Sequence, residues 1–205
     1  MVRKEYEQYH YDDPDSTYTY PNSSTLRNIL AIHNTALALE KEYQLSSERI
    51  LELNIKPIAV RSMNDVRAIH RFIFQDMYSW AGEYRKVNIS KSGNSFMAKE
   101  SFVMGEEYLN DLICTYHETA ITKAQIAKQL AVILDNLNHM HPFREGNGRC
   151  QREVILSLAA ERGFDLFLDV ASDDEVYNRY MEGTVNGDKK IIEELFLKVL
   201  EPTDD

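Results

Sequence analysis

Cysteines are few in this sequence and long apolar segments are absent. Of its 205 residues only Cys114 and Cys150 are cysteines, too few for a disulfide framework or a four-cysteine zinc site, so we expect two buried free thiols in a reducing compartment. No apolar run approaches the ~20 residues of a transmembrane helix. Residues 1–20 are acidic and tyrosine-rich and lack the apolar core of a secretory signal. We therefore expect a cytoplasmic protein with no membrane contact, while delivery into another cell stays open.

Basic residues are also scarce. The chain has 23 Lys and Arg against 33 Asp and Glu, which gives a net charge of -10. Nucleic-acid binding requires a basic surface that displaces counterions from phosphates, so we expect no nucleic-acid partner. A phosphate ligand would have to be held by a local cluster of positive groups, because the field of the whole protein repels it.

What the chain does have is apolar residues at helical spacing. With 43% hydrophobic and 27% charged residues, it has the composition of one globular domain. Residues 1–24 are turn-rich and predict an irregular arm, and residues 25–205 predict a single helical domain. Ser24 and Ser62 are candidate N-caps, and Asp65 would complete a capping box with Ser62. Helical periodicity occurs at residues 26–37, 66–77, 102–116, 126–137, 154–159 and 191–199.

Residues 84–97 break this helical pattern. Residues 84–90 alternate polar and β-favouring side chains, a turn-forming segment follows, and residues 95–97 can return as a second strand. We predict a short β-hairpin, alone in an otherwise all-α domain, which lies on the helices because an isolated hairpin is only marginally stable. Its exposed edge could pair with an extended peptide; a plain connection is the equal alternative.

The most informative segment is residues 141–152, which read His-Pro-Phe-Arg-Glu-Gly-Asn-Gly-Arg-Cys-Gln-Arg. His141 continues the apolar series of the preceding helix. Pro142 ends that helix, because proline has no N–H and disfavours helical geometry in the residue before it. Phe143 is the expected apolar anchor, and Arg144 is expected to point outward. The segment therefore predicts a tight loop between two helices, with His141 directed inward.

The glycines of this segment predict an anion-binding turn. Gly146 and Gly148, on either side of Asn147, permit positive φ and let backbone N–H groups approach a ligand. The following helix presents its free N–H groups and the positive end of its dipole to the same space. Arg149 and Arg152 lie three residues apart, so both guanidinium groups can bind a polyphosphate from one face. Cations are unfavourable at a helix N-terminus, and such a conflict is typical of a functional site.

Two further residues add chemistry to this turn. A carboxylate beside phosphates, as at Glu145, suits Mg²⁺, which usually takes one or two carboxylates plus phosphate oxygens. His141, with an ordinary pKa near ~6.5, can accept a proton from a hydroxyl at neutral pH. A base, a metal ligand and a phosphate cradle fit phosphoryl or nucleotidyl transfer. Each feature alone is more often structural, and their combination in one segment favours function.

Residues 141–152 resemble the signature of the Fic family, His-x-Phe-x-Asp/Glu-Gly-Asn-Gly-Arg with a second arginine three residues later. Residues 80–90, Trp-Ala-Gly-Glu-Tyr-Arg-Lys-Val-Asn-Ile-Ser, look like the hairpin flap of that family. The similarity covers about residues 60–185, and the N-terminal arm is similar to toxin-type members. The resemblance implies an all-α Fic fold that binds MgATP and transfers AMP to a Ser, Thr or Tyr hydroxyl of a target protein.

The resemblance also implies roles for individual residues. His141 would be the general base and Glu145 the ligand of Mg²⁺. The target segment would be aligned by the flap residues Ile89, Ser90, Lys91 and Gly93. The nucleotide would be bound by Gly146, Asn147 and Gly148 at the α- and β-phosphates, by Arg149 and Arg152 at the β- and γ-phosphates, and by Lys91, Ser92, Asn138 and Asn178 around them.

Two comparisons with the family pattern refine the expected activity. Members that phosphorylate their targets have a lysine where Gly148 stands, so this glycine favours AMP transfer. Many members are silenced by a helix with Ser/Thr-x-x-x-Glu-Gly/Asn, whose glutamate pairs with the second arginine. Glu followed by Gly or Asn occurs here only at Glu145-Gly146 and Glu182-Gly183, and neither has Ser or Thr four residues earlier. The resemblance therefore predicts a toxin-type enzyme that is restrained at Arg152 by a small, separate antitoxin-like protein.

Two other classes of function stay open. The chain could be a nucleotide-binding interaction protein without catalysis, although the intact His141 and Glu145 argue against this. It could also be a Fic-type enzyme that uses another donor of a phosphate-linked group, such as UMP or phosphocholine, or that removes AMP. A helical transcription factor is disfavoured by the net charge of -10.

Overall fold

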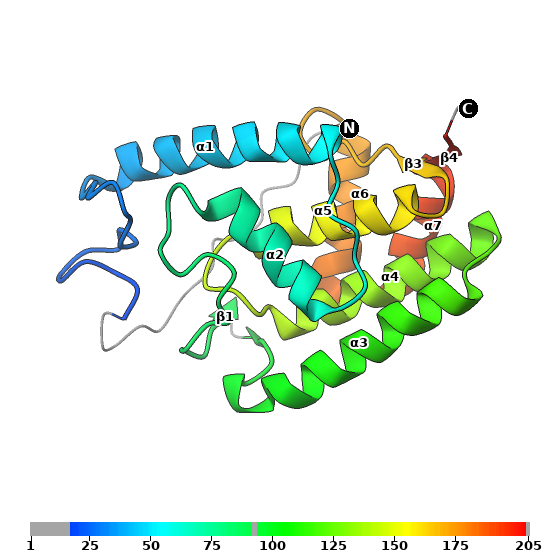
Figure 1. Cartoon of the computed structure of the whole chain (residues 1–205), viewed down its shortest axis with the longest axis horizontal. Coiled ribbons are helices and arrows are strands. Elements are labelled where there is room, and N and C mark those ends of the chain that lie inside the picture. The colour runs from blue at the N-terminus through cyan, green and yellow to red at the C-terminus, as the bar shows by residue number, and fades with distance from the viewer. Residues whose placement is uncertain (1–16, 92–93, 204–205) are drawn as a thin grey trace.

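The computed structural model describes residues 17–91 and 94–203 and shows a bundle of helices with two-stranded sheets (Figure 1). No helix in these ranges is both long enough and apolar enough to cross a membrane. The helices are α1 (Thr35–Ile55), α2 (Met63–Phe74), the 3-10 turn η1 (Lys99–Ser101), α3 (Phe102–Thr119), α4 (Lys123–Met140), α5 (Asn147–Ala160), α6 (Asp174–Asn186) and α7 (Lys189–Val199). The strands are β1 (Ser90–Lys91), β2 (Asn94–Ser95), β3 (Phe164–Leu166) and β4 (Leu200–Pro202).

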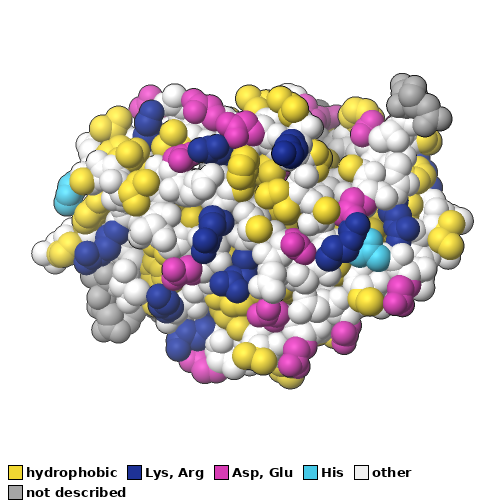
Figure 2. All heavy atoms as spheres, viewed as in Figure 1, with side chains coloured by type: hydrophobic (Ala, Val, Ile, Leu, Met, Phe, Trp, Pro, Cys, Tyr) yellow, Lys and Arg dark blue, Asp and Glu magenta, His cyan; other side chains and the backbone are white. Residues whose placement is uncertain are grey.

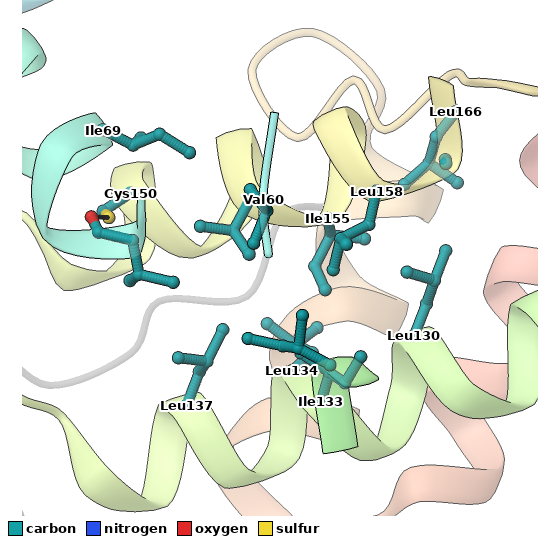
Figure 3. Packing of buried hydrophobic residues seen from close by; sticks show 14 of the residues in the cluster. Val60, Ile69, Leu130, Ile133, Leu134, Leu137, Cys150, Ile155, Leu158 and Leu166 are labelled. Carbon is teal, nitrogen blue, oxygen red and sulfur yellow. Dashed lines mark hydrogen bonds between the residues drawn. The ribbon is translucent and has the colours of Figure 1, made fainter. Parts of the chain in front are cut away.

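Helix α4 lies at the centre of the bundle and packs against α3, α5 and α7. Figure 3 shows Leu130, Leu134 and Leu137 of α4 pointing toward Ile155 and Leu158 of α5. All five side chains are buried, and burying a side chain of this size contributes about 1.5–3 kcal/mol. This contact fixes the relative positions of the two helices that flank the loop at residues 141–146.

The all-α fold class is confirmed, and the later predicted helices correspond to α2, α3, α4, α5 and α7. Helix α2 begins as expected, because the Asp65 carboxylate accepts a hydrogen bond from the N–H of the N-cap Ser62 at 2.9 Å. Apolar periodicity did not indicate helix α6, which contains Asn178. The division into an arm of residues 1–24 and a domain of residues 25–205 stays a prediction, since residues 1–16 lie outside the described residues.

The helix predicted over residues 26–37 is wrong in its first part. Residues 26–34 form turns, and α1 begins only at Thr35 with Asn34 as its N-cap. The Asn28 side chain bonds the Ile32 N–H at 2.9 Å and the carbonyls of Leu26 and Ile32 at 3.0 and 2.8 Å. An asparagine side chain that satisfies nearby backbone groups in this way competes with helix formation. The apolar periodicity of the segment therefore does not decide its structure.

The predicted β-hairpin is confirmed, but its strands are limited to Ser90–Lys91 and Asn94–Ser95, so most of the strand predicted over residues 84–90 is wrong. Strands β1 and β2 pair antiparallel, with Ser90 opposite Ser95. The expectation that this hairpin is the only β-structure is wrong, because β3 and β4 form a second antiparallel sheet with Leu166 opposite Leu200. Both leucines are buried. The sheet therefore attaches β4, which follows α7, to β3, which follows α5.

The two cysteines differ from one another. Cys150 of α5 is buried as expected, whereas Cys114 of α3 is exposed, so the prediction of two buried thiols is wrong for Cys114. On the face shown in Figure 2, acidic and basic side chains are interspersed. The net negative charge of the protein therefore does not form a single acidic field over this face.

A cavity of about 420 Å³ lies between α1, α5 and β3. Its walls include Leu53, Ile58 and Leu156, and one of its few charged residues is Glu153 of α5. Burial raises the pKa of Glu153 to about 7, and the positive charge of Arg152 acts in the opposite direction. The folded protein thus holds a proton on Glu153 more tightly than the unfolded chain does.

This binding difference makes the stability of the protein depend on pH. The unfolded carboxyl ionises near pH 4.5 and the folded one near pH 7, so wild type loses free energy of unfolding as pH rises through this window. We expect the Glu153→Gln variant to gain about 2 kcal/mol over wild type between pH 5 and pH 8. Chemical denaturation at both pH values measures this gain. Glu40→Gln, on the exposed side of α1, is the control, and equal pH profiles for wild type and Glu153→Gln would contradict the assignment.

Candidate active site

His141 lies at the C-terminal end of α4 in the left-handed region, with φ 45° and ψ 59°, a conformation that is uncommon for a residue with a side chain. It is 2% exposed, which confirms the inward direction. Its Nδ1 is 3.3 Å from the carbonyl oxygen of Asn138, and its ring stacks on Phe96 with 3.9 Å between centroids. The contact with a carbonyl oxygen assigns the proton to Nδ1 and the acceptor lone pair to Nε2.

A buried arginine holds this strained end of α4. Arg85 donates from Nε to the His141 carbonyl at 2.9 Å, from one terminal nitrogen to the Val87 carbonyl at 2.7 Å, and from the other to the carbonyls of Met97 and Met140. Burial lowers the pKa of Arg85 to about 10, so the group stays charged at neutral pH. A cation at a helix C-terminus satisfies carbonyls that have no partner within the helix. Arg85 thereby joins α4 to the hairpin segment.

The loop between α4 and α5 is closed by its own residues. Asn147 accepts from the Phe143 N–H at 2.9 Å and donates to the Phe143 carbonyl at 2.7 Å. Phe143 is buried as predicted and stacks on the ring of His70, with 3.8 Å between centroids. The expectation that Arg144 points outward is wrong, because Arg144 is buried and its guanidinium lies 5.8 Å from the centre of the Tyr18 ring.

His70 of α2 also supports the loop between α4 and α5. Its Nδ1 accepts from the Gly82 N–H at 2.9 Å, so its Nε2 carries the proton and donates to the Glu145 carbonyl at 2.9 Å. Burial lowers the pKa of His70 to about 3. This histidine is therefore neutral at physiological pH, and its two ring nitrogens hydrogen-bond Gly82 and the loop residue Glu145.

Position 146 can accommodate only a glycine. Its φ is 78°, and a Cβ atom added there would lie 2.2 Å from the Phe74 ring. Gly148 is different, since an added Cβ would meet only the Arg152 guanidinium, at 3.5 Å. The chain therefore needs a glycine at position 146 for the turn, while at position 148 the absence of a side chain leaves open space at the N-terminus of α5.

Glu145 places a carboxylate beside this turn. Its Oε1 accepts from the Gly146 N–H at 3.0 Å. Burial raises the pKa of Glu145, while the Gly146 N–H and the positive Arg149 act in the opposite direction. Among residues 17–91 and 94–203 no group of three or more acidic, His or Cys residues could hold a metal ion by itself.

The two predicted phosphate-binding arginines have different surroundings. Arg149 forms an ion pair with Glu42 of α1 and donates to the Ser46 hydroxyl at 2.9 Å. The guanidinium of Arg152 lies 6.0 Å from the centre of the Tyr180 ring and hydrogen-bonds the Tyr180 side chain. In the described part of the chain no carboxylate lies within ion-pair distance of Arg152.

The structure describes only some of the remaining predicted site residues. Asn138 donates to the Thr184 carbonyl at 2.8 Å, and Asn178 of α6 is buried. Ile89 is buried, while Ser90 and Lys91 form β1. Ser92 and Gly93 lie outside the described residues, and so does the Lys91 side chain. The hairpin is tied to the site, since the Phe96 N–H bonds the Ile89 carbonyl at 3.2 Å and the Phe96 ring covers His141.

Three supporting residues were missed at the level of sequence. His70 interrupts the apolar stripe of α2, and this was its only signal. Arg85 lies in the segment assigned to the flap, where nothing local indicates a buried role. Glu42 lies on a helix that is otherwise mostly exposed. Each is defined by contacts with segments far away in the chain, which a local pattern does not contain.

Comparison with known proteins identifies the family. The model of the Fic/DOC family matches residues 61–159. The chain is 30% identical over 158 residues to "Probable protein adenylyltransferase y4lH" of Sinorhizobium fredii, which covers 76% of this chain and 81% of that protein. The protein therefore belongs to the Fic/DOC family.

Two other likenesses extend this finding. The chain is 29% identical over 188 residues to "Probable protein adenylyltransferase Fic" of Escherichia coli (strain K12), covering 89% of this chain and 91% of the relative. A solved structure of the N-terminal Fic domain of a VirB-translocated Bep effector protein from Bartonella quintana, with bound ADP, has a TM-score of 0.78 at 20% identity. It covers 91% of this chain and 95% of that one, which shows a shared fold.

The two glycines of the turn give a direct test of their separate roles. We expect Gly146→Ala to lower the free energy of unfolding by about 3 kcal/mol, because the added methyl group overlaps the Phe74 ring at a positive φ. Gly148→Ala should be neutral or stabilise by up to about 1 kcal/mol, since alanine favours the helix. Denaturant unfolding of both variants measures these values. Comparable destabilisation by the two changes would contradict the assignment of open space at position 148.

Proposed function

We propose that the protein is a protein adenylyltransferase that transfers AMP from MgATP to a Ser, Thr or Tyr hydroxyl of a target protein. The observation that supports this most directly is the placement of His141 and the N-terminus of α5 at the two ends of one short, tightly fixed loop. A buried base thus lies beside a phosphate-binding turn. Relatives of the chain are named protein adenylyltransferases, and a Fic domain of the same fold has bound ADP.

In the proposed reaction His141 is the general base. The hydroxyl of the target transfers its proton to Nε2 of His141, while its oxygen attacks the α-phosphorus of ATP. A bond forms between that oxygen and the phosphorus, and the bond from the α-phosphorus to the bridging oxygen breaks. Pyrophosphate leaves with the electron pair, and the hydroxyl becomes an AMP ester. The His141 carbonyl is held by Arg85, so the base stays oriented through this step.

The phosphates would be stabilised by the N-terminus of α5 and its neighbours. Gly146, Asn147 and Gly148 would line the phosphates, with the backbone N–H groups at the start of α5 directed at the developing charge, and Arg152 offers a guanidinium without a carboxylate partner in the described part of the chain. Glu145 would hold Mg²⁺ together with phosphate oxygens, where the ion would neutralise part of the phosphate charge. Gly148 leaves this cradle without a side chain that could redirect the nucleotide.

The target segment would bind along the β1–β2 hairpin. The hairpin adjoins His141 through Phe96, and the Met97 N–H bonds the His139 carbonyl at 3.0 Å. An extended peptide that pairs with a strand edge here would bring its hydroxyl toward the base. Ile89 to Gly93 would set its register.

We further propose that a separate antitoxin-like protein restrains the enzyme at Arg152. Arg152 has no carboxylate partner in the described part of the chain, and its neighbour Tyr180 supplies only a hydroxyl and a ring face. An external carboxylate bound to Arg152 would compete with the phosphates of the nucleotide for this cation.

The proposed reaction predicts which phosphate is transferred. With ATP labelled at either the α- or the γ-phosphorus and a lysate as the source of targets, label should reach protein only from the α-position. The His141→Ala variant should lose at least about a hundredfold in rate, because it removes the base. Transfer from the γ-position would indicate a kinase, label only from UTP or a phosphocholine donor would indicate another donor, and loss of AMP from modified protein would indicate the reverse activity.

The proposed restraint predicts the behaviour of the isolated chain. Purified protein with no partner should AMPylate itself or added targets at full rate, and mass spectrometry of the +AMP product measures this. His141→Ala serves as the background. A correctly folded chain that binds MgATP but is inactive alone would contradict restraint by a separate protein, since the restraint would then lie within this chain.

A further inference from the structure

Helix α1 has a small buried face that is half polar. The helix lies beside α2 (Figure 1), and its buried residues are Ala38, Glu42, Ser46 and Leu53. Glu42 and Ser46 are four residues apart and therefore share one face. Charged side chains are rarely buried unless they are paired, so a glutamate whose side chain is 5% exposed on such a helix requires a specific partner.

That partner is Arg149 in the first turn of α5. One terminal nitrogen of its guanidinium bonds Glu42, and the other bonds the Ser46 hydroxyl at 2.9 Å. The guanidinium also lies 4.7 Å from the centre of the Phe74 ring. Two hydrogen bonds from one helix face and a ring contact leave the planar group a single orientation.

Glu42 is itself fixed by a second donor. The Tyr78 hydroxyl donates to Oε2 of Glu42, while Oε1 receives the Arg149 bond. Tyr78 is buried and stacks on Trp80, with 4.3 Å between centroids. Both carboxylate oxygens therefore have partners, which is the condition under which a buried ion pair has a defined geometry.

This network meets the phosphate turn at the Phe74 ring. The ring of Phe74 contacts both the Arg149 guanidinium and the backbone of Gly146. The arrangement links α1 to the N-terminus of α5, whereas the position of His141 is set separately by Arg85.

We infer that Glu42 is a positioning residue of the nucleotide site: with Ser46 and Tyr78 it orients Arg149 and thereby holds the N-terminal turn of α5 in its phosphate-binding shape. The inference rests on the proposed function and deepens it. It assigns α1, which lies before the residues matched by the family model, a role in binding ATP. It also gives the two arginines different roles: Arg149 would hold the shape of the turn, and Arg152 would bind the phosphates directly.

Because Glu42 acts on the phosphate turn and not on the base, its effect should fall on KM. We expect Glu42→Gln to raise KM for ATP about tenfold with kcat changed less than about twofold, since the substitution replaces a charge-assisted hydrogen bond to Arg149 by a weaker neutral one. Ser46→Ala and Tyr78→Phe each remove one bond without burying a new charge, and each should raise KM about threefold. Steady-state AMP transfer and titration with a fluorescent ATP analogue in the presence of Mg²⁺ measure these changes.

Glu40→Gln is the matched control, because Glu40 is an exposed glutamate on the same helix. Equal KM values for Glu40→Gln and Glu42→Gln would overturn the inference, and so would a fall in kcat at constant KM. A lower KM in Glu42→Gln would also overturn it, since Glu42 would then compete with phosphate for Arg149. If Glu42→Gln does not fold, the Ser46 and Tyr78 variants decide.

The proposed function and the inference can fail separately. A wild-type chain that binds the ATP analogue but transfers no AMP would contradict the enzyme activity, while weaker binding by the Glu42, Ser46 and Tyr78 variants would still support the positioning role. A wild-type chain that binds no nucleotide would overturn both.

Discussion

The buried guanidinium of Arg85 is the interaction on which the rest of the site depends. The end of a helix leaves carbonyl groups without partners, and α4 ends inside the protein at a residue in the left-handed region. Arg85 supplies donors to the carbonyls of Met140 and His141 and, with the same group, to Val87 and Met97. One charge thus satisfies the helix end and attaches the hairpin segment to it, so His141, the loop and the hairpin share a single support.

From this support the loop is built largely by rigid contacts. Asn147 closes the loop on Phe143, Phe143 rests on His70, and Gly146 rests on Phe74. Several side chains of residues 141–152 therefore serve to shape the turn and are not available to a ligand. What remains for a ligand is the backbone at the start of α5, the space at Gly148, the Glu145 carboxylate and Arg152. The chemistry proposed above uses this remainder.

The sequence predicts the parts of this arrangement that arise from local rules. The capping box at Ser62, the stop at Pro142 and the apolar stripes of α4 and α5 are properties of neighbouring residues, and the structure agrees with them. Arg144 was wrongly directed outward because its contact, Tyr18, lies more than a hundred residues earlier. The β3–β4 sheet joins three-residue strands from distant segments, too short to give an alternating pattern. Asn28 shows the reverse case, in which a local side-chain bond overrides a convincing apolar period.

The distribution of buried charge is consistent with the proposed anion site in an acidic protein. Arg85 is surrounded by carbonyl oxygens and Arg149 by Glu42 and Ser46, so neither contributes an uncompensated charge to the interior. Arg152 differs from both, since in the described part of the chain it has no carboxylate within ion-pair distance and its guanidinium lies 6.0 Å from the centre of the Tyr180 ring. At a helix N-terminus this placement is locally unfavourable, and a polyphosphate would relieve it. The -10 net charge then limits non-specific anion binding elsewhere, which leaves selectivity to one arginine, one turn and the oriented N–H groups around them.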